Sequence, residues 1–432
     1  MIFIPKADTS QTKPENPRPI SLLNVEGKLF DKILKNRFMN QIELRGLNDD
    51  RQHGFRRNRG TNTALATIYE TIANKMNQQC LVDIVLRDVS KAFDKVWHKG
   101  LQFKILNLGL HTCFTRILTS FLSNRTASIR IDQHIGTPFA LKSGVPQGAC
   151  LSPSLYTFYI HDIGEPPANT DYSAYADDIT QIIATLGLRA RGRVSLHSKK
   201  AIEHINHFEK KWKIKTNPTK FSLINLLRKK TASVCVDNTT YEYTKQGKVL
   251  GLQVNSHGIC PQAAVRKHAA RANLAKLYRF KNLSENNKRK LYLSTVQSTL
   301  IYPTVPFNTI SKSQMLQLQA VQNQGLKFIT NTSWDEYRTA QSLHEQCNID
   351  PINVIIHNQA AKTWQKMEDF LPGIYHKLVD DTPEIRRLAQ RFPSSRLKAE
   401  GPPPHPLYAH QRPIRDVLID EDDLTDDEED LL

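Results

Sequence analysis

Three aspartates could carry the chemistry of this chain. Asp88 follows an apolar run, residues 81–86, that reads as a strand, and Asp177 and Asp178 stand at the tip of a predicted hairpin. Carboxylates at the ends of neighbouring strands can converge on one point. Such a point suits Mg²⁺, and two ions about 3.5–4 Å apart can activate a hydroxyl and stabilise leaving pyrophosphate. An Asp-Asp pair alone is weak evidence, because adjacent acids in a loop are usually just solvated.

The elements that would position these aspartates are short strands and helices in the first 260 residues. Strands are predicted at 81–86, 126–131, 172–176, 179–184, 221–226, 234–236 and 249–254, and helices at 101–108, 112–123, 151–163 and 194–214. Residues 261–300 hold nine Lys or Arg and one acid, Glu285. They predict helices, as do residues 311–330.

The composition points to a polyanionic partner. The net charge is +17, but the last 17 residues carry ten acids and no Lys or Arg, so residues 1–415 have a net charge of +27. A body this basic suits nucleic acid, because each neutralised phosphate releases counterions. The alternative is a merely soluble basic protein.

The sequence excludes several other classes of protein. No apolar run is long enough for a membrane span, and the N-terminus does not read as a signal peptide, so we expect an intracellular protein. The six cysteines form no C-x-x-C pair, which argues against a zinc knuckle and a disulfide framework.

Seven motifs in order carry a resemblance to a known family. They are IPK at 4–6 with RPISL at 18–22, QHGFR at 52–56, LRDVSKAFD at 86–94, SGVPQGACLSP at 143–153, YADD at 175–178, WKIKTNPTK at 212–220 and VLGL at 249–252. In kind and spacing they resemble the reverse transcriptases of non-LTR retrotransposons, of the jockey type. The resemblance covers residues 1–330, and more loosely extends to about 390.

This resemblance implies an α+β right-hand polymerase fold with fingers, a palm with an antiparallel sheet, and a helical thumb. We expect fingers and palm in 1–260, the thumb in 261–335, a helical extension in 336–391, and a Pro-rich, acidic, disordered tail in 392–432. The implied function is RNA-directed DNA polymerase, with an RNA template, a DNA primer, their hybrid and deoxynucleoside triphosphates as partners, and no membrane.

The resemblance also implies the reacting groups. Asp88 and Asp177 would bind two Mg²⁺ ions, with Mn²⁺ a possible substitute, together with the backbone carbonyl of Val89. Asp178 would complete the triad. Lys220 would act as a general acid towards the departing pyrophosphate.

A second set of residues is implied for the nucleotide. The ring of Phe93 would clash with a 2′-hydroxyl and select deoxynucleotides, although Phe93 could simply be core. Gln147 and Gly148 would lie against base and sugar, and Lys6 and Arg18 would grip the triphosphate.

Basic residues would hold the nucleic acid. Arg56, Arg57 and Arg59 would guide the template through the fingers. A thumb helix face would track the hybrid without reading its sequence, unless it is an ordinary solvated face. That face comprises Arg266, Lys267, Arg271 and, further on, Lys276, Arg279 and Lys281.

Several features depart from the family pattern. Arg87 stands where the family often has an apolar residue, and it could pair with a neighbouring acid or depress metal affinity. The abrupt start and the lack of an endonuclease domain suggest an N-terminally truncated element product. Its alternative function is that of a catalytically inactive RNA-binding remnant; an RNA-dependent RNA polymerase is disfavoured by Phe93 and Ala176. We expect it in nucleus and cytoplasm.

Overall fold

The computed structural model describes residues 2–4, 18–128, 130–131, 133–187, 191–226, 233–256, 258–260, 262–333, 336–380 and 394–408. The chain divides into two compact units. Unit 1 comprises Met1–Ile259 and Met367–Phe392, and unit 2 comprises Cys260–Lys366 and Pro393–Leu432. Among the described helices, none is both long and apolar enough to cross a membrane.

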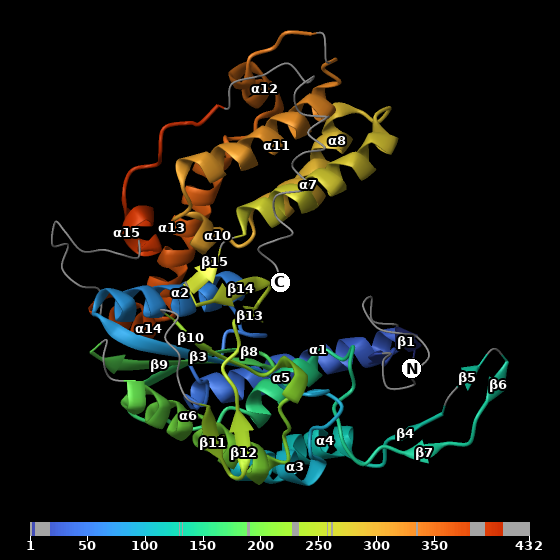
Figure 1. Ribbon diagram of the computed structural model, residues 1–432. Coiled ribbons are helices and arrows are strands. Elements are labelled where there is room, and N and C mark those ends of the chain that lie inside the picture. The colour runs from blue at the N-terminus through green and yellow to red at the C-terminus, as the bar shows by residue number, and fades with distance from the viewer. Residues whose placement is uncertain are drawn as a thin grey trace. The chain divides into compact units, whose positions relative to one another are not determined.

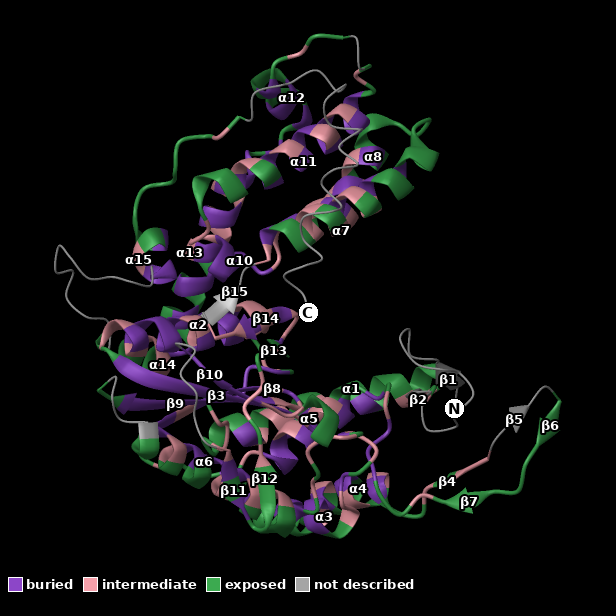
Figure 2. Ribbon diagram, viewed as in Figure 1, coloured by how far each residue is buried: buried purple, intermediate pink, exposed green. Residues whose placement is uncertain are grey.

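Unit 1 is built on a four-stranded antiparallel sheet with the strand order β10-β3-β9-β8. These strands are β3 (Cys80–Asp88), β8 (Thr170–Tyr175), β9 (Asp178–Leu186) and β10 (Ser222–Asn225). Helices α2 (Thr61–Asn77) and α6 (Arg191–Trp212) cover opposite faces of the sheet (Figure 1). Because both faces are covered, β3 is buried along nearly its whole length, which explains its continuous apolar run (Figure 2).

The other helices of unit 1 enclose a second core beside the sheet. They are α1 (Val25–Leu44), α3 (His98–Asn107), α4 (Thr112–Leu122) and α5 (Leu151–Tyr159). Late in the chain, α14 (Pro372–Asp380) returns to pack on α2, where the Asn74 side chain donates a 3.0 Å hydrogen bond to the Leu378 carbonyl. Residues 372–380 are therefore part of the folded body that carries the sheet.

Smaller sheets complete unit 1. They are β1 (Ile2–Ile4) with β2 (Arg18–Ile20), β11 (Val234–Val236) with β12 (Thr239–Tyr241), and β13 (Gln246–Val249) with β14 (Leu252–Asn255) and β15 (Gly258–Cys260). The predicted single strand 249–254 is wrong. Leu250 and Gly251 adopt φ angles of 46° and 82°, so the chain reverses there and forms two strands.

An extended arm projects from the base of unit 1 between α4 and α5 (Figure 1). It pairs β4 (Thr126–Ala127) with β7 (Phe139–Ala140), and further out β5 (Arg130–Ile131) with β6 (His134–Ile135). Strands β6 and β7 are exposed (Figure 2). The predicted strand 126–131 is thus split between two short ladders.

Unit 2 is helical in its described part. It contains α7 (Ala263–Leu277), α8 (Glu285–Tyr292), α9 (Ser298–Ile301), α10 (Thr304–Phe307), α11 (Lys312–Thr330), α12 (Ala340–Cys347), most of α13 (Ile352–Phe370) and α15 (Ser395–Glu400). A capping box between Ser311 and Gln314 explains where α11 begins.

Two of the expected domain ranges differ from this division. Residues 336–366 belong to the same compact unit as 261–333, so thumb and extension are not separate bodies, and α14 belongs to unit 1. The expected disorder of 392–432 is wrong for Ser395–Glu400, which form α15 with Ser394 as its N-cap. Residues 409–432 lie outside the described part of the chain.

Candidate active site

The three predicted aspartates lie together at one end of the main sheet. Asp88 is the last residue of β3 and pairs in register with Asp178, the first residue of β9. Ala176 and Asp177 form the turn between β8 and β9, and the Val89 N–H donates a 3.3 Å hydrogen bond to the Asp177 carbonyl. The strand ladder therefore brings all three side chains to one place, with Val89 beside them.

The electrostatics of Asp178 reflect this convergence. Burial, followed by the negative charges of Asp177 and Asp88, raises the pKa of the Asp178 carboxyl to about 7, while Lys220 acts in the opposite direction. Two neighbouring carboxylates oppose the ionisation of this carboxyl, and a cation that enters the site stabilises its ionised form. The acids thus form an electrostatically unfavourable group unless positive charge is supplied.

Lys220 supplies one such charge. Its ammonium nitrogen lies 3.0 Å from Oδ2 of Asp88. The short 3-10 helix Pro218–Lys220 carries it there. Asn217 caps this helix through its side chain, and its N–H donates a 2.8 Å hydrogen bond to the Asp88 carbonyl. The loop is therefore tied directly to the residue that Lys220 faces.

Gln52 holds the turn before the aspartates, a role that sequence reasoning missed. Its amide oxygen accepts hydrogen bonds from the N–H groups of Ala176 (2.8 Å) and Gly54 (2.7 Å), and its amide nitrogen donates to the Ala176 carbonyl (3.3 Å). Ala176 has a φ angle of +56°, a conformation that L residues rarely adopt. A Cβ at Gly54 would lie 2.3 Å from the Ala176 nitrogen. The only signal in the sequence was the QHGFR motif itself.

Arg87 pairs with an acid, which answers the question that the sequence left open. Its side chain is only 2% exposed, and it donates to Oδ1 of Asn206 (2.9 Å), Oε1 of Glu209 (3.3 Å) and the Ile202 carbonyl (3.2 Å), all on α6. Burial lowers the pKa of Arg87, and the charge of Glu209 opposes that shift.

The same Glu209 holds the loop that leads to Lys220. Its carboxylate accepts hydrogen bonds from the hydroxyl and the N–H of Thr216. Thr216 forms a bridge with Val89, and the Ser90 N–H donates to the Lys215 carbonyl at 2.9 Å. Arg87 and Glu209 therefore connect the end of β3 to this loop.

The predicted nucleotide-binding residues line a neighbouring part of unit 1. Phe93 is partly buried, with its ring stacked on Tyr156 at 5.2 Å and edge-on to Phe55 at 6.0 Å. The Gln147 amide donates a 2.7 Å hydrogen bond to Oδ1 of Asp94. Phe93 thus has the packing of a core residue on at least two sides, as the alternative reading allowed.

Gly148 also allows a close approach within the protein. Its φ angle is +105°, and a Cβ there would lie 2.6 Å from the Ser21 carbonyl oxygen. Nearby, the Ser21 N–H donates a 2.6 Å hydrogen bond to the Gln147 carbonyl. The close approach that Gly148 permits is therefore to the segment after β2.

Two of the three fingers arginines are held within the protein. Arg59 ion-pairs with Asp50 at 2.6 Å and is 4% exposed, and Arg56 donates a 2.6 Å hydrogen bond to the Asp49 carbonyl. Both guanidinium groups fix the loop before Gln52. Arg57 is exposed and stays a candidate for template binding.

The remaining predicted positions are Lys6, Arg18 and the basic residues of α7 and the segment after it. Lys6 lies outside the described residues, and only the backbone of Arg18 is described, in β2. Arg266, Lys267 and Arg271 lie on α7 of unit 2 and are half-buried, with Arg266 over the Tyr302 ring at 5.2 Å. The exposed basic positions of that segment are Lys276, Arg279 and Lys281.

The aspartate oxygens suit a divalent cation, although they do not form a complete set of metal ligands. In the part of the chain that the structure describes, His, Cys, Asp and Glu side chains form no ready cluster of three or more metal ligands. The donors that converge are hard carboxylate oxygens, which Mg²⁺ prefers, and the Lys220 ammonium stands where positive charge is needed. Mg²⁺ usually keeps waters and substrate phosphates in its shell, so an incomplete protein cage fits it.

Comparison with known proteins decides the family. A family model described as reverse transcriptase (RNA-dependent DNA polymerase) matches residues 4–254, more than half of the chain. The chain belongs to the reverse transcriptase family. The resemblance and the right-hand polymerase fold predicted from the motifs are thereby confirmed, and all three aspartates lie inside the matched range.

The relatives of this reverse transcriptase come from mobile elements. It is 26% identical over 420 residues to the probable RNA-directed DNA polymerase from transposon BS of Drosophila melanogaster, covering 93% of this chain and 44% of the relative. It is 25% identical over 422 residues to the RNA-directed DNA polymerase from mobile element jockey of Drosophila funebris, covering 92% and 44%. The chain thus spans less than half the length of these curated relatives.

Among solved structures, telomerase from Candida tropicalis in complex with the TWJ fragment of telomeric RNA matches with a TM-score of 0.39 and 14% identity. The match covers 82% of this chain and 57% of the telomerase.

Proposed function

We propose that this chain is an RNA-directed DNA polymerase of a non-LTR retrotransposon, which copies an RNA template into DNA from a DNA primer. The observation that carries the proposal is the meeting of Asp88, Asp177 and Asp178 at one end of the sheet, inside the part of the chain that matches reverse transcriptases. The named relatives from transposon BS and jockey support the same activity.

In this proposal the chain's own groups divide the work of nucleotidyl transfer. Asp88, Asp177 and the Val89 carbonyl offer oxygen ligands for two divalent cations, Mg²⁺ or Mn²⁺, and Asp178 completes the set. Bound there, the cations would neutralise charge on the phosphates and activate the primer hydroxyl. Lys220, whose ammonium group lies beside Asp88, would give a proton to the departing pyrophosphate.

The choice of nucleotide rests on Phe93, Gln147 and Gly148. The stacking of Phe93 on Tyr156 fixes the ring, and a fixed ring under the sugar would exclude a 2′-hydroxyl by steric clash. Gln147, held by Asp94, would lie against the nucleotide, and Gly148 would keep that segment close to Ser21. Lys6 and Arg18 complete the proposed triphosphate grip, and nucleus and cytoplasm stay the predicted compartments.

Primer extension tests the function. The purified chain is given a DNA primer on an RNA template with Mg²⁺ and deoxynucleotides, beside Asp177→Asn. A matched control is Asp237→Asn, because Asp237, like Asp177, is an aspartate in the two-residue turn of a β-hairpin, and it is exposed. We expect extension by the wild type and Asp237→Asn, and a loss of at least about 100-fold in Asp177→Asn.

Two further outcomes separate the alternatives. Extension with ribonucleotides as efficient as with deoxynucleotides would reject the discrimination assigned to Phe93. Hybrid binding with no extension would favour the inactive RNA-binding remnant and overturn the proposal of a working polymerase.

A further inference from the structure

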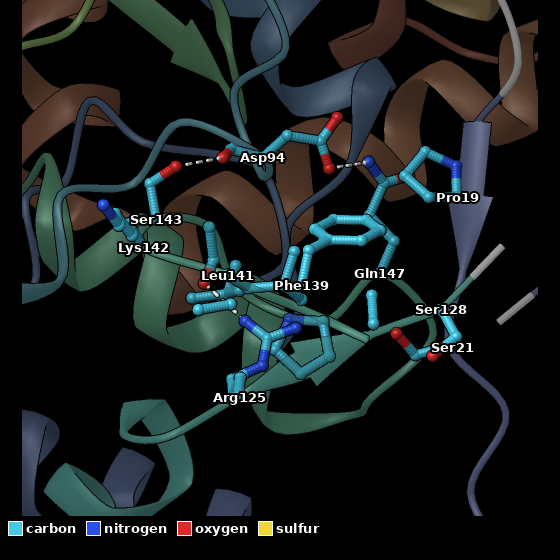
Figure 3. Close-up of a pocket in the computed structure, with 15 residues that line it drawn as sticks. Pro19, Ser21, Asp94, Arg125, Ser128, Phe139, Leu141, Lys142, Ser143 and Gln147 are labelled. Atoms are coloured by element: carbon cyan, nitrogen blue, oxygen red, sulfur yellow. Dashed lines mark hydrogen bonds between the residues drawn. The ribbon is translucent and has the colours of Figure 1, made fainter. Parts of the chain in front are cut away.

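A cavity of about 290 Å³ lies in unit 1 between the segment after β2, the base of the arm and the motif that carries Gln147 (Figure 3). Its apolar walls include Pro19, Leu141, Val145 and Pro146. None of the three site aspartates lines it. The cavity is therefore distinct from the reacting centre, although it shares Gln147 with the proposed nucleotide grip.

One side of the cavity carries a cation that lacks an acidic partner. Arg125 is half-buried and donates a 2.7 Å hydrogen bond to the Gly144 carbonyl, but no carboxylate in the described residues pairs with it. Burial alone lowers the pKa of Arg125. Lys142 lies exposed on the same lining. A half-buried guanidinium without a counterion is costly, and a phosphate would relieve that cost.

The opposite side carries an acceptor. Figure 3 shows Asp94 and Arg125 far apart in the lining, with Phe139 and Gln147 between them. Oδ1 of Asp94 accepts from Gln147 at 2.7 Å, which leaves Oδ2 without a partner among the described residues. Phe139 is 46% exposed, so its ring is available for stacking. Across the cavity the lining therefore offers in turn a cation (Arg125), an aromatic ring (Phe139) and a carboxylate that can accept a hydrogen bond from a hydroxyl (Asp94).

We propose that this cavity holds one nucleotide of the single-stranded RNA template, just ahead of the hybrid. Arg125 binds its phosphate, Phe139 stacks on its base, and Asp94 accepts the ribose 2′-hydroxyl. Aromatic stacking and 2′-hydroxyl contacts are the usual means by which proteins hold single-stranded RNA. The inference rests on the proposed polymerase function and deepens it.

The chemistry of the lining separates the template from the other substrates. An incoming triphosphate and the primer end must both reach the site aspartates, which do not line this cavity. One half-buried cation suits a single phosphodiester rather than a triphosphate. The free carboxylate oxygen of Asp94 favours a sugar that can donate a 2′ hydrogen bond, which deoxyribose cannot do.

Equilibrium binding of the full chain to labelled RNA–DNA hybrids tests this site without measuring synthesis. One hybrid is blunt, and the other has a three-nucleotide 5′ RNA overhang. We expect Arg125→Met to weaken binding of the overhang hybrid about tenfold and to leave binding of the blunt hybrid unchanged. For the overhang hybrid, the slope of the logarithm of the binding constant against the logarithm of the salt concentration should also become shallower by about 0.7. The matched control is Arg116→Met, on an exposed position of α4, which should change neither.

Two more variants address the base and the sugar. Phe139→Leu should weaken binding of the overhang hybrid by a similar factor, because leucine cannot stack on the base as an aromatic ring does. Asp94→Ala should abolish the preference for an RNA overhang over a DNA overhang of the same sequence.

Three results would overturn the proposal. One is equal weakening of both hybrids by Arg125→Met, and another is no weakening of either. The third is unchanged overhang affinity with weakened nucleotide binding, which would assign the cavity to the incoming triphosphate. A chain that binds these hybrids as expected but extends no primer would fail only the proposed function, because no catalytic step enters the measurement.

Discussion

Both units of the molecule bury a glutamine, a histidine and a cation. In unit 1 these are Gln52, His53 and Arg87, and in unit 2 they are Gln319, His344 and Lys288, none more than 6% exposed. Polar groups buried at this depth need hydrogen-bond partners in either place. The two sets differ in what those partners are.

In unit 2 the buried polar groups connect helices to one another. Gln319 donates to Asn323 at 2.9 Å and accepts from the Ile352 N–H at 2.8 Å. His344 bonds the Ile349 carbonyl at 2.7 Å, and Lys288 donates to Oδ1 of Asn331 at 2.7 Å. These contacts stabilise the packing of α8, α11, α12 and α13 and reach no group that we assign to the reaction.

In unit 1 the same kinds of residue hold the backbone that carries the aspartates. Gln52 binds both backbone groups of Ala176, and Arg87 reaches the Lys220 loop through Glu209. His53 contributes through its backbone N–H, which donates to the Ala174 carbonyl at 2.8 Å, while its imidazole contacts the Thr63 hydroxyl at 2.9 Å. Burial of polar groups therefore serves stability in unit 2, and stability together with the position of the carboxylates in unit 1.

The cations give the largest contrast. Arg87→Met breaks a buried ion pair, which should lower the free energy of unfolding by about 3 kcal/mol and slow primer extension as well. Lys288→Met should affect unfolding only. Urea denaturation and single-turnover extension, measured on folded protein, check both. An extension rate unchanged in Arg87→Met would remove the positional role of the Arg87–Glu209 pair.

The glutamines give the next contrast. Gln52→Met keeps the shape of the side chain but loses both hydrogen bonds to Ala176 in the turn. A shift of about 1 Å in the carboxylates should cost about 100-fold in rate. It should also raise the Mg²⁺ concentration needed for half-maximal extension. Gln319→Met should destabilise unit 2 without either change. Equal Mg²⁺ requirements for the two variants would refute the proposal that Gln52 holds the turn that carries the aspartates.

Gln52→Glu sharpens this test. A carboxylate keeps the acceptor for the Ala176 N–H but cannot donate to the Ala176 carbonyl, whereas a protonated carboxyl can. Extension by Gln52→Glu, relative to wild type at the same pH, should therefore improve as the pH falls. A ratio independent of pH would mean that the donated hydrogen bond is unimportant.

The histidines give the smallest contrast. Burial, together with the charges of Arg59 and Arg56, lowers the pKa of His53 to about 3. The unfolded state then binds a proton at about pH 6.5 and the folded state does not, so stability is lost as the pH falls below 6.5, by up to about 1.4 kcal/mol per pH unit. His53→Gln should remove this dependence.

His344 should contribute less to the pH dependence. Burial lowers its pKa, but its hydrogen bond to Ile349 and the charge of Asp350 raise it. Urea denaturation between pH 7.5 and 5 compares His344→Gln with His53→Gln. If His344→Gln reduced the pH dependence of the free energy of unfolding more than His53→Gln does, the larger contribution assigned to His53 would be wrong.

The sequence predicted what depends on local pattern. The apolar run before Asp88 and the strand-turn-strand around Asp177 were enough to bring the aspartates to one end of a sheet, because strand pairing fixes where strand ends meet. It did not predict the roles of Gln52 or Gly148, since both act on backbone more than 100 residues away in sequence. Nor could spacing reveal that Arg59 is held by Asp50, because an arginine in a basic loop has the same pattern whether it faces solvent or a carboxylate.

The central claim is that Asp88, Asp177 and Asp178 form a divalent cation site, and Fe²⁺-directed backbone cleavage tests it most directly. Fe²⁺ replaces Mg²⁺, and hydroxyl radicals generated with ascorbate and peroxide cut the chain near the bound iron. We predict cuts within about two residues of Val89 and Asp177, suppressed by excess Mg²⁺ and absent in Asp177→Asn. Cuts elsewhere, or cuts at these places that persist in Asp177→Asn, would contradict the account.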